Sequence, residues 1–95
     1  MAKDYKAKFV LGRLLATPGA LKALAQAGQE AIEFLSRHQH GDWGDMDDED
    51  KKENDLSVLN NYRILSAYKL KTGVKIWIIT EADRSATTIL LPSEY

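Results

Sequence analysis

The sequence predicts an α+β fold in which two or three helices pack on one face of a three- or four-stranded, mainly antiparallel sheet. Three observations lead to this prediction: a short apolar run near the start, helical periodicities with capping residues in the middle, and three β-rich runs in the last third. Short connections between the last three runs favour neighbouring antiparallel strands. The predicted order of elements is therefore β-α-α-α-β-β-β.

The first strand and the first helix are predicted between residues 9 and 28. Residues 9–16 (FVLGRLLA) form a short apolar run in which Gly12 allows a bulge. Thr17 can cap the free N–H groups of a helix, and Pro18 is tolerated in the first turn because its missing N–H has no helical partner there. Gly28 ends this helix or marks a sharp bend. The apolar stripe of the helix is predicted to contain Leu21, Leu24 and Ala25.

The second helix is predicted over residues 29–38, with Ala31, Ile32 and Leu35 on one face at spacings of three and four. A loop bounded by two glycines follows and carries Trp43. Two roles are open for this tryptophan. The ring could plug the core, or it could be an exposed anchor, because tryptophan is enriched in interface hot spots.

The third helix is predicted to begin with Asp45 or Asp47 as its N-cap. Three acidic residues follow in the first turn, where the helix dipole favours negative charge. We expect Leu56 and Leu59 to supply the apolar contacts of this helix.

The last third of the chain predicts an antiparallel meander. Residues 63–70 and 74–80 are β-rich runs separated by a compact connection that contains a glycine. Residues 76–79 (IWII) are apolar on both alternations, which predicts a central strand covered on both faces. Residues 86–91 form the last strand. The first strand of the chain is expected at an edge of the sheet with no assigned partner, so homo-oligomerisation through an edge strand stays open.

Size and composition predict one domain, residues 1–95, with residues 1–7 as a flexible basic end. The absence of cysteine excludes disulfides and cysteine-based zinc sites and permits a cytoplasmic location. No apolar run approaches the about 20 residues that span a bilayer, so no membrane association is expected. A net charge of −1 argues against direct nucleic-acid binding, since general nucleic-acid binders are usually strongly basic.

Charge is distributed unevenly along the chain. Residues 42–55 contain eight acidic residues and two lysines, which give this segment a net charge of −6. Since the whole chain carries −1, the other residues together carry +5. The chain therefore joins an acidic segment to a basic remainder, and a charged partner would approach along this polarity.

Four stretches of the chain together resemble a family of small bacterial proteins carried on plasmids, phages and other mobile elements. They are ATPGAL (16–21), RHQHGDWGD (37–45), RILSAY (63–68) and WIITEADRSATTILLPSEY (77–95). Members are labelled "plasmid-related protein" or, misleadingly, "type I restriction endonuclease subunit M". A methyltransferase subunit needs a doubly wound α/β domain with a glycine-rich turn, which this chain lacks. The resemblance covers nearly the whole chain and implies a role in conflict with host defence.

The leading hypothesis is a non-catalytic protein-interaction module of the anti-restriction or anti-CRISPR type, which masks a surface of another protein. The acidic segment and the adjoining tryptophan loop would form its docking surface. A basic, nucleic-acid-binding surface on the partner would match this charge, and salt would weaken the association. The predicted partner-binding residues are Asp42, Trp43, Asp45, Asp47, Asp48, Glu49 and Asp50.

The rival hypothesis is a small metal-independent ribonuclease of the barnase or colicin type. His38 would act as general acid or base because the ordinary pKa of histidine lies near neutral pH. Arg84 would stabilise the phosphate in the transition state, and Thr87 or Thr88 would position it. The acidic segment that follows His38 argues against this hypothesis, because it repels phosphate.

Histidines and carboxylates near residue 40 raise the question of a metal site. The candidate ligands are His38, His40, Asp42, Asp45 and Asp47. Their spacing does not match the EF-hand pattern, and two histidines two positions apart are not a common chelating pair on a helix. We therefore predict a helix end followed by a capped acidic helix start, with no metal and no cofactor.

Overall fold

The computed structural model describes residues 6–95, which form a four-stranded mixed sheet and three α-helices. The elements, in chain order, are β1 (Arg13–Ala16), α1 (Pro18–Ala27), α2 (Ala31–Gln39), α3 (Asp48–Asn60), β2 (Ile64–Lys69), β3 (Lys75–Thr80), β4 (Ala86–Leu90) and the 3-10 turn η1 (Pro92–Glu94). The predicted α+β class and the order β-α-α-α-β-β-β are confirmed. Residues 1–5 of the predicted flexible basic end lie outside the described residues.

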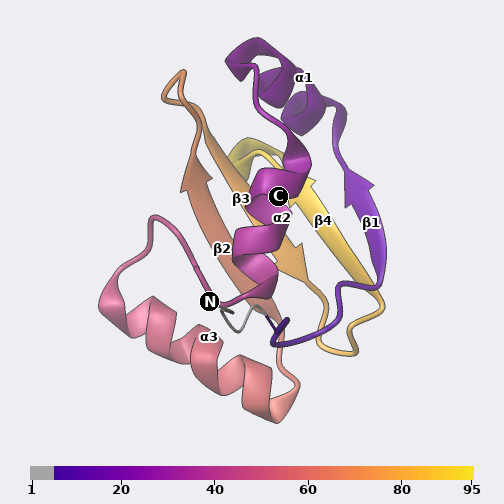
Figure 1. Cartoon of the computed structure of the whole chain (residues 1–95), viewed down its shortest axis with the longest axis vertical. Coiled ribbons are helices and arrows are strands. Elements are labelled where there is room, and N and C mark those ends of the chain that lie inside the picture. Colours follow the sequence, from indigo (N-terminus) through magenta and orange to yellow (C-terminus); the bar gives the residue numbers. More distant parts are fainter. Residues whose placement is uncertain (1–5) are drawn as a thin grey trace, which may run out of the picture.

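The sheet has the strand order β1-β4-β3-β2. β2 and β3, and likewise β3 and β4, are antiparallel neighbours, whereas β1 lies parallel to β4. A parallel pair needs a crossover connection, which the helices between β1 and β4 provide. Figure 1 shows β1 as the outermost strand, α2 in front of the sheet, and α3 beside β2. The predicted edge position of the first strand is thus confirmed, and its partner is β4.

The first strand is shorter than predicted. β1 begins at Arg13 instead of residue 9, because Gly12 has a φ of 66° and leaves the extended conformation. A Cβ at Gly12 would lie 2.4 Å from the carbonyl oxygen of Arg84, so the close approach of the β3–β4 turn requires glycine. The preceding Phe9 packs instead in a second apolar cluster with Trp43.

The main core lies between the sheet and the two helices α1 and α2. Its buried members are Ala20, Ala23, Leu24, Phe34, Leu35, Tyr68, Leu70, Ile76, Ile78 and Ile89. The predicted apolar stripes are wrong at Leu21, Ala25 and Ile32, which are all exposed. One residue along a helix rotates the side chain by about 100°, so adjacent apolar positions differ sharply in burial.

The face of the sheet away from α1 and α2 is partly covered by aromatic side chains. The Trp77 ring meets the Tyr95 ring edge-on at 5.8 Å between centroids, and the Arg63 guanidinium lies 5.2 Å from the Tyr95 centroid. Ile79 and Leu90 are buried on this face. β3 is therefore a central strand with apolar residues buried on both faces, as its double apolar alternation predicts.

The outer edge of β2 is closed by the segment around Gly44 and by α3. Gly44 forms an isolated bridge with Ala67, whose N–H donates to the carbonyl of Trp43 at 3.2 Å. Asn54 on α3 donates from Nδ2 to the carbonyl of Leu65 at 2.7 Å and accepts from the Leu65 N–H at 3.3 Å. These bonds satisfy backbone groups that an edge strand otherwise leaves open.

Polar contacts and the packing of Val58 against the cluster of Phe9 and Trp43 hold α3 in place, which corrects the predicted apolar contacts of Leu56 and Leu59. These two leucines are 50% and 78% exposed, while the buried residues of the helix are Asn54 and Ser57. Each leucine lies two positions after a buried residue and so points about 200° away from it around the helix. The outer side of α3 therefore carries two leucines that are at least half exposed.

Asn54→Ala is expected to lower the free energy of unfolding by about 2–4 kcal/mol, because it leaves the N–H and the carbonyl of Leu65 without partners. The matched control is Asn60→Ala, which removes an exposed side-chain bond to the Leu56 carbonyl and should change stability by less than about 1 kcal/mol. Urea denaturation of both variants measures the difference. Equal losses would show that Asn54 does not seal the β2 edge.

Candidate functional site

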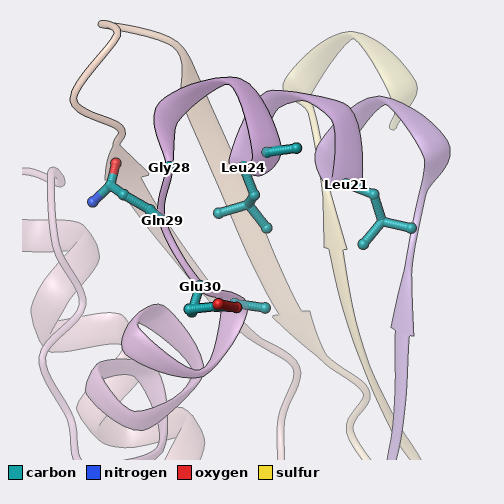
Figure 2. Close-up of a pocket in the computed structure, with 7 residues that line it drawn as sticks. Leu21, Leu24, Gly28, Gln29 and Glu30 are labelled. Atoms are coloured by element: carbon teal, nitrogen blue, oxygen red, sulfur yellow. The ribbon is translucent and has the colours of Figure 1, made fainter.

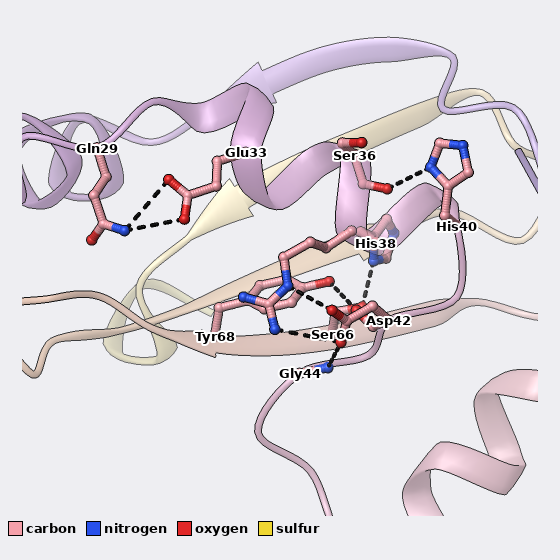
Figure 3. A network of polar contacts seen from close by, with 10 residues as sticks. Gln29, Glu33, Ser36, His38, His40, Asp42, Gly44, Ser66 and Tyr68 are labelled. Atoms are coloured by element: carbon pink, nitrogen blue, oxygen red, sulfur yellow. Dashed lines mark hydrogen bonds and ion pairs between the residues drawn. The ribbon is translucent and has the colours of Figure 1, made fainter. Parts of the chain in front are cut away.

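His38 is the centre of a buried polar network on the helix-covered face of the sheet. Its side chain comes from the last turn of α2 and is 0% exposed. Nδ1 lies 2.5 Å from Ser66 Oγ on β2, as Figure 3 shows, and Nε2 lies 2.8 Å from Thr80 Oγ1 on β3. Both ring nitrogens therefore have hydrogen-bond partners, one as donor and one as acceptor in a neutral imidazole.

The network continues to β4 and to the segment before β1. Thr80 Oγ1 lies 2.7 Å from Thr87 Oγ1, which donates to the carbonyl of Leu11 at 2.7 Å. Within residues 6–95, no buried side-chain nitrogen or oxygen lacks a hydrogen-bond partner. A complete buried network is stable because each lost bond would leave a polar group unpaired away from water.

Burial keeps His38 in its neutral form. Removal from water disfavours the imidazolium, and the positive charge of Arg84 disfavours it further, which lowers the pKa of His38 from 6.5 to about 3. The rings of Phe9 and Trp43 meet the imidazole edge-on, with centroids at 5.2 and 6.0 Å. These contacts enclose the histidine in an apolar setting, so it carries no charge at neutral pH.

Arg84 lies in the β3–β4 turn with a φ of 61°. Its guanidinium donates to the carbonyls of Ser57 and Tyr62 at 2.9 and 2.8 Å, at the C-terminal end of α3. A cation at this end suits the helix dipole. The guanidinium also lies 5.6 Å from the centroid of Phe9. Arg84 therefore joins α3 to the sheet, a role that the turn sequence did not indicate.

The structure brings some of the proposed ribonuclease residues close together and separates others. His38 and Thr87 belong to one buried network, and the Phe9 ring contacts both His38 and Arg84. Thr88 follows Thr87 on β4 and so points to the opposite face of the sheet. A general acid or base has to reach the proton that it transfers. Because His38 is fully buried, the geometry gives this hypothesis no accessible imidazole.

Two carboxylates of the acidic segment form ion pairs with basic residues. Asp42 pairs with Arg37 at 2.7 Å, and the hydrogen bond from Arg37 lowers the pKa of Asp42 (Figure 3). The backbone carbonyl of Asp42 also accepts from the Tyr68 hydroxyl at 2.6 Å. Asp45 pairs with Lys75 at 3.5 Å. Both carboxylates thus have structural partners, which reduces the charge that they offer to another protein.

Two further carboxylates stabilise α3 and the loop before it. Asp47 is the N-cap of α3 and accepts from the Asp50 N–H at 2.8 Å. Asp55 accepts from Trp43 Nε1 at 3.0 Å. Trp43 is only 3% exposed and lies in the apolar cluster with Phe9. Of the two roles open for Trp43, the structure supports the core plug, so this ring is not available to a partner.

The other acidic side chains of α3 make no hydrogen bond or ion pair with a described residue: Asp48, Glu49, Asp50 and Glu53. Asp48 and Glu49 point to the side of the helix opposite to Asn54, whereas Glu53 lies about 100° from Asn54, at the border of that side. The residues on that side and at its border, which we call the α3 outer face, are Asp48, Glu49, Lys52, Glu53, Leu56 and Leu59. All of them are exposed. The α3 outer face therefore combines net negative charge with two leucines.

The five candidate metal ligands do not form a cluster. His38 is buried, and His40 Nδ1 lies 2.7 Å from the carbonyl of Ser36. Asp42 and Asp45 are engaged by basic residues, and Asp47 caps a helix. In the described part of the chain, no three His, Asp or Glu residues gather where they could hold a metal ion.

A shallow groove lies between the end of α1 and the start of α2. Leu21 and Leu24, labelled in Figure 2, line it together with Ala31 and make the lining mainly apolar. Gln29, at its rim, accepts from the Lys71 N–H at 2.8 Å. The groove lacks the converging polar groups that orient a bound small molecule, so we assign no ligand site to it.

Comparisons with protein-family models, with curated proteins and with solved structures found no match. Among residues 6–95, no helix is both long enough and apolar enough to cross a bilayer. Function is therefore inferred from the geometry and charge of the chain itself.

The free energy of unfolding is expected to fall as the pH falls below 6.5. Unfolded His38 binds a proton near pH 6.5, whereas folded His38 stays neutral down to about pH 3. Between these values the unfolded state binds more protons, so stability is greatest above pH 6.5 and is lost by up to about 1.4 kcal/mol per pH unit. Urea denaturation at about pH 7, 6 and 5 measures this slope.

Two variants test the origin of that slope. His38→Gln removes the buried imidazole and should abolish the pH dependence in this window, whatever its effect on overall stability. His40→Gln removes the other histidine and should leave the slope unchanged. A wild-type protein whose stability is flat between about pH 7 and 5 would contradict a buried neutral His38.

Proposed function

We propose that this protein is a non-catalytic interaction module that masks a surface of another protein through the α3 outer face. One observation carries the proposal: Leu56 and Leu59 are exposed beside carboxylates that pair with no described residue, on a helix that the fold holds by its opposite side. Protein interfaces combine an apolar centre with a polar rim in the same way. A partner with an apolar hollow surrounded by basic groups would match this face.

Electrostatics favours a basic partner. Residues 42–55 carry a net charge of −6, and the carboxylates of Asp48, Glu49 and Glu53 are not neutralised within the described chain. Exposed charge of one sign mainly raises the rate at which a protein associates with a partner of opposite charge, and salt screens this effect. Proteins that bind DNA or RNA carry basic surfaces of this kind. We therefore propose that the masked surface is a nucleic-acid-binding site.

An anti-defence role fits this mode of action. The resemblance to proteins of plasmids and phages implies a chain that travels with mobile DNA and acts in the bacterial cytoplasm. Masking requires no catalytic group, metal or cofactor, because the inhibitor only has to occupy the surface that nucleic acid would use. We propose inhibition of the anti-restriction or anti-CRISPR type as the biological role.

Neutralising the acidic part of the α3 outer face should slow association with the partner. We expect the triple variant Asp48→Asn/Glu49→Gln/Glu53→Gln to reduce the association rate about tenfold at low salt. At about 1 M salt the Debye length is about 3 Å, and the difference should disappear. Partner proteins are captured from a lysate of the source bacterium, and surface plasmon resonance then measures the rates against salt.

The matched control removes the same number of charges elsewhere. The triple variant Glu30→Gln/Glu33→Gln/Glu81→Gln changes the N-cap of α2, a residue of α2 and the β3–β4 turn, and it should leave the association rate close to wild type. The captured partner is then titrated with labelled DNA or RNA, which the protein should displace competitively. Equal rates for both triple variants would exclude the α3 outer face as the docking surface.

The two leucines should act on dissociation. Leu56→Ser/Leu59→Ser is expected to raise the dissociation rate at least tenfold, because it removes the apolar centre of the contact. The stability of the isolated protein should change by less than about 1 kcal/mol, since both side chains are exposed. The control is Leu21→Ser on α1, which is similarly exposed and should leave binding unchanged. Unaltered dissociation in the double variant would contradict the proposal.

A further inference from the structure

One edge of the sheet is covered by other segments of the chain, whereas the opposite edge is open. The β2 edge is closed by Asn54 and by the segment around Gly44. At the opposite edge, all four residues of β1 are exposed, and Figure 1 shows no segment of the described chain beside that strand. Leu14 and Leu15 are 55% and 45% exposed there. An open edge with exposed apolar side chains is a template for pairing with another strand.

The backbone of β1 directs its free groups in a defined pattern. The N–H of Arg13 donates to the Ser85 carbonyl, and the N–H of Thr17 donates to the Ile89 carbonyl, both at 3.0 Å. Alternate residues of a strand direct their backbone groups to the same side, so Arg13 and Thr17 point toward β4. Leu14 and Ala16 occupy the other set of alternate positions, so they direct their N–H and carbonyl groups away from β4, toward solvent.

This pattern is self-complementary. When a second β1 lies antiparallel with Leu15 opposite Leu15, residue 14 of each copy faces residue 16 of the other. Each such pair exchanges two backbone hydrogen bonds, so the two-fold arrangement forms four. The side chains at position 15 meet on the sheet face away from α2, and both copies keep their helices on the same face.

Charge is compatible with pairing at this edge. In the register centred on Leu15, Arg13 of one copy faces Thr17 of the other, and the two arginines lie four residues apart along the strand. The acidic α3 lies at the far edge of the sheet, beside β2, so the two acidic helices of the pair are held far from each other. Self-pairing at β1 therefore brings no strongly acidic surfaces together.

We propose that β1 is a self-association edge: two copies of the chain pair antiparallel through β1, centred on Leu15, and form a continuous eight-stranded sheet. The paired segment of four residues is short compared with the about 800 Å² that each partner buries in a standard interface. The dimer is therefore weak, with a dissociation constant on the order of 100 μM.

Analytical ultracentrifugation of the full chain tests the association. The average mass should rise from 10.7 kDa toward twice that value as the concentration increases from about 10 μM to about 1 mM. Leu15→Lys places two ammonium groups opposite each other and should keep the protein monomeric. Leu59→Lys on α3 is the matched control and should still dimerise. A protein that stays monomeric up to about 1 mM overturns the proposal.

Disulfide trapping tests the register, because the chain contains no cysteine. In the proposed register the Cα atoms at position 15 lie about 4.5 Å apart, within the about 4.4–6.8 Å that a disulfide spans. Leu15→Cys should therefore form a covalent dimer under mild oxidation. Leu14→Cys should not, since its two copies lie about 9 Å apart. Equal trapping of both variants, or association that persists in Leu15→Lys, overturns the β1 register.

Discussion

The hydrogen-bond chain through neutral His38 is the interaction on which the rest of the structure depends. It connects the last turn of α2 with β2, β3 and β4 and ends on the carbonyl of Leu11, just before β1. Each hydroxyl in the chain occupies an inward position of the sheet, where an apolar residue would be the default. Every polar group in this hydrogen-bond network has a partner. If any strand shifted its register by one residue, a buried polar group would lose its hydrogen bond. The network therefore selects a single register for the sheet.

α3 is attached by a different means, and this explains why its outer face is free. Asn54 bonds to the backbone of β2, and Arg84 bonds to the end of the helix from the β3–β4 turn. These contacts and the packing of Val58 hold one side of the helix, and the two leucines of the other side stay at least half exposed. Exposed apolar side chains that lie together on one surface are typical of interaction sites. The proposed partner would cover the two leucines and meet the carboxylates beside them, which pair with no described residue.

The sequence predicted what local chemistry determines and failed where burial depends on distant residues. Thr17 and Asp47 cap their helices as expected, because a cap needs only the next three residues. The contacts of Leu56 and Leu59 were mispredicted, since hydrophobicity does not reveal that an amide at position 54 takes the core-facing side. His38 was chosen as a candidate catalytic residue only because it is a histidine. Its partners Ser66 and Thr80 lie 28 and 42 positions away, and their inward places in apolar strands were the signal that could have found them.

Self-association through β1 and docking through α3 would act together, because they use opposite edges of one sheet. A dimer joined at β1 carries an acidic α3 at each end, related by a two-fold axis. Many nucleic-acid-binding proteins are two-fold dimers themselves, so a two-fold masking module can engage both of their basic surfaces at once. The second contact is then intramolecular, which raises avidity without any new interaction. Since the dimer is weak, masking would begin once the protein has accumulated, and its strength would follow the cellular concentration of the chain.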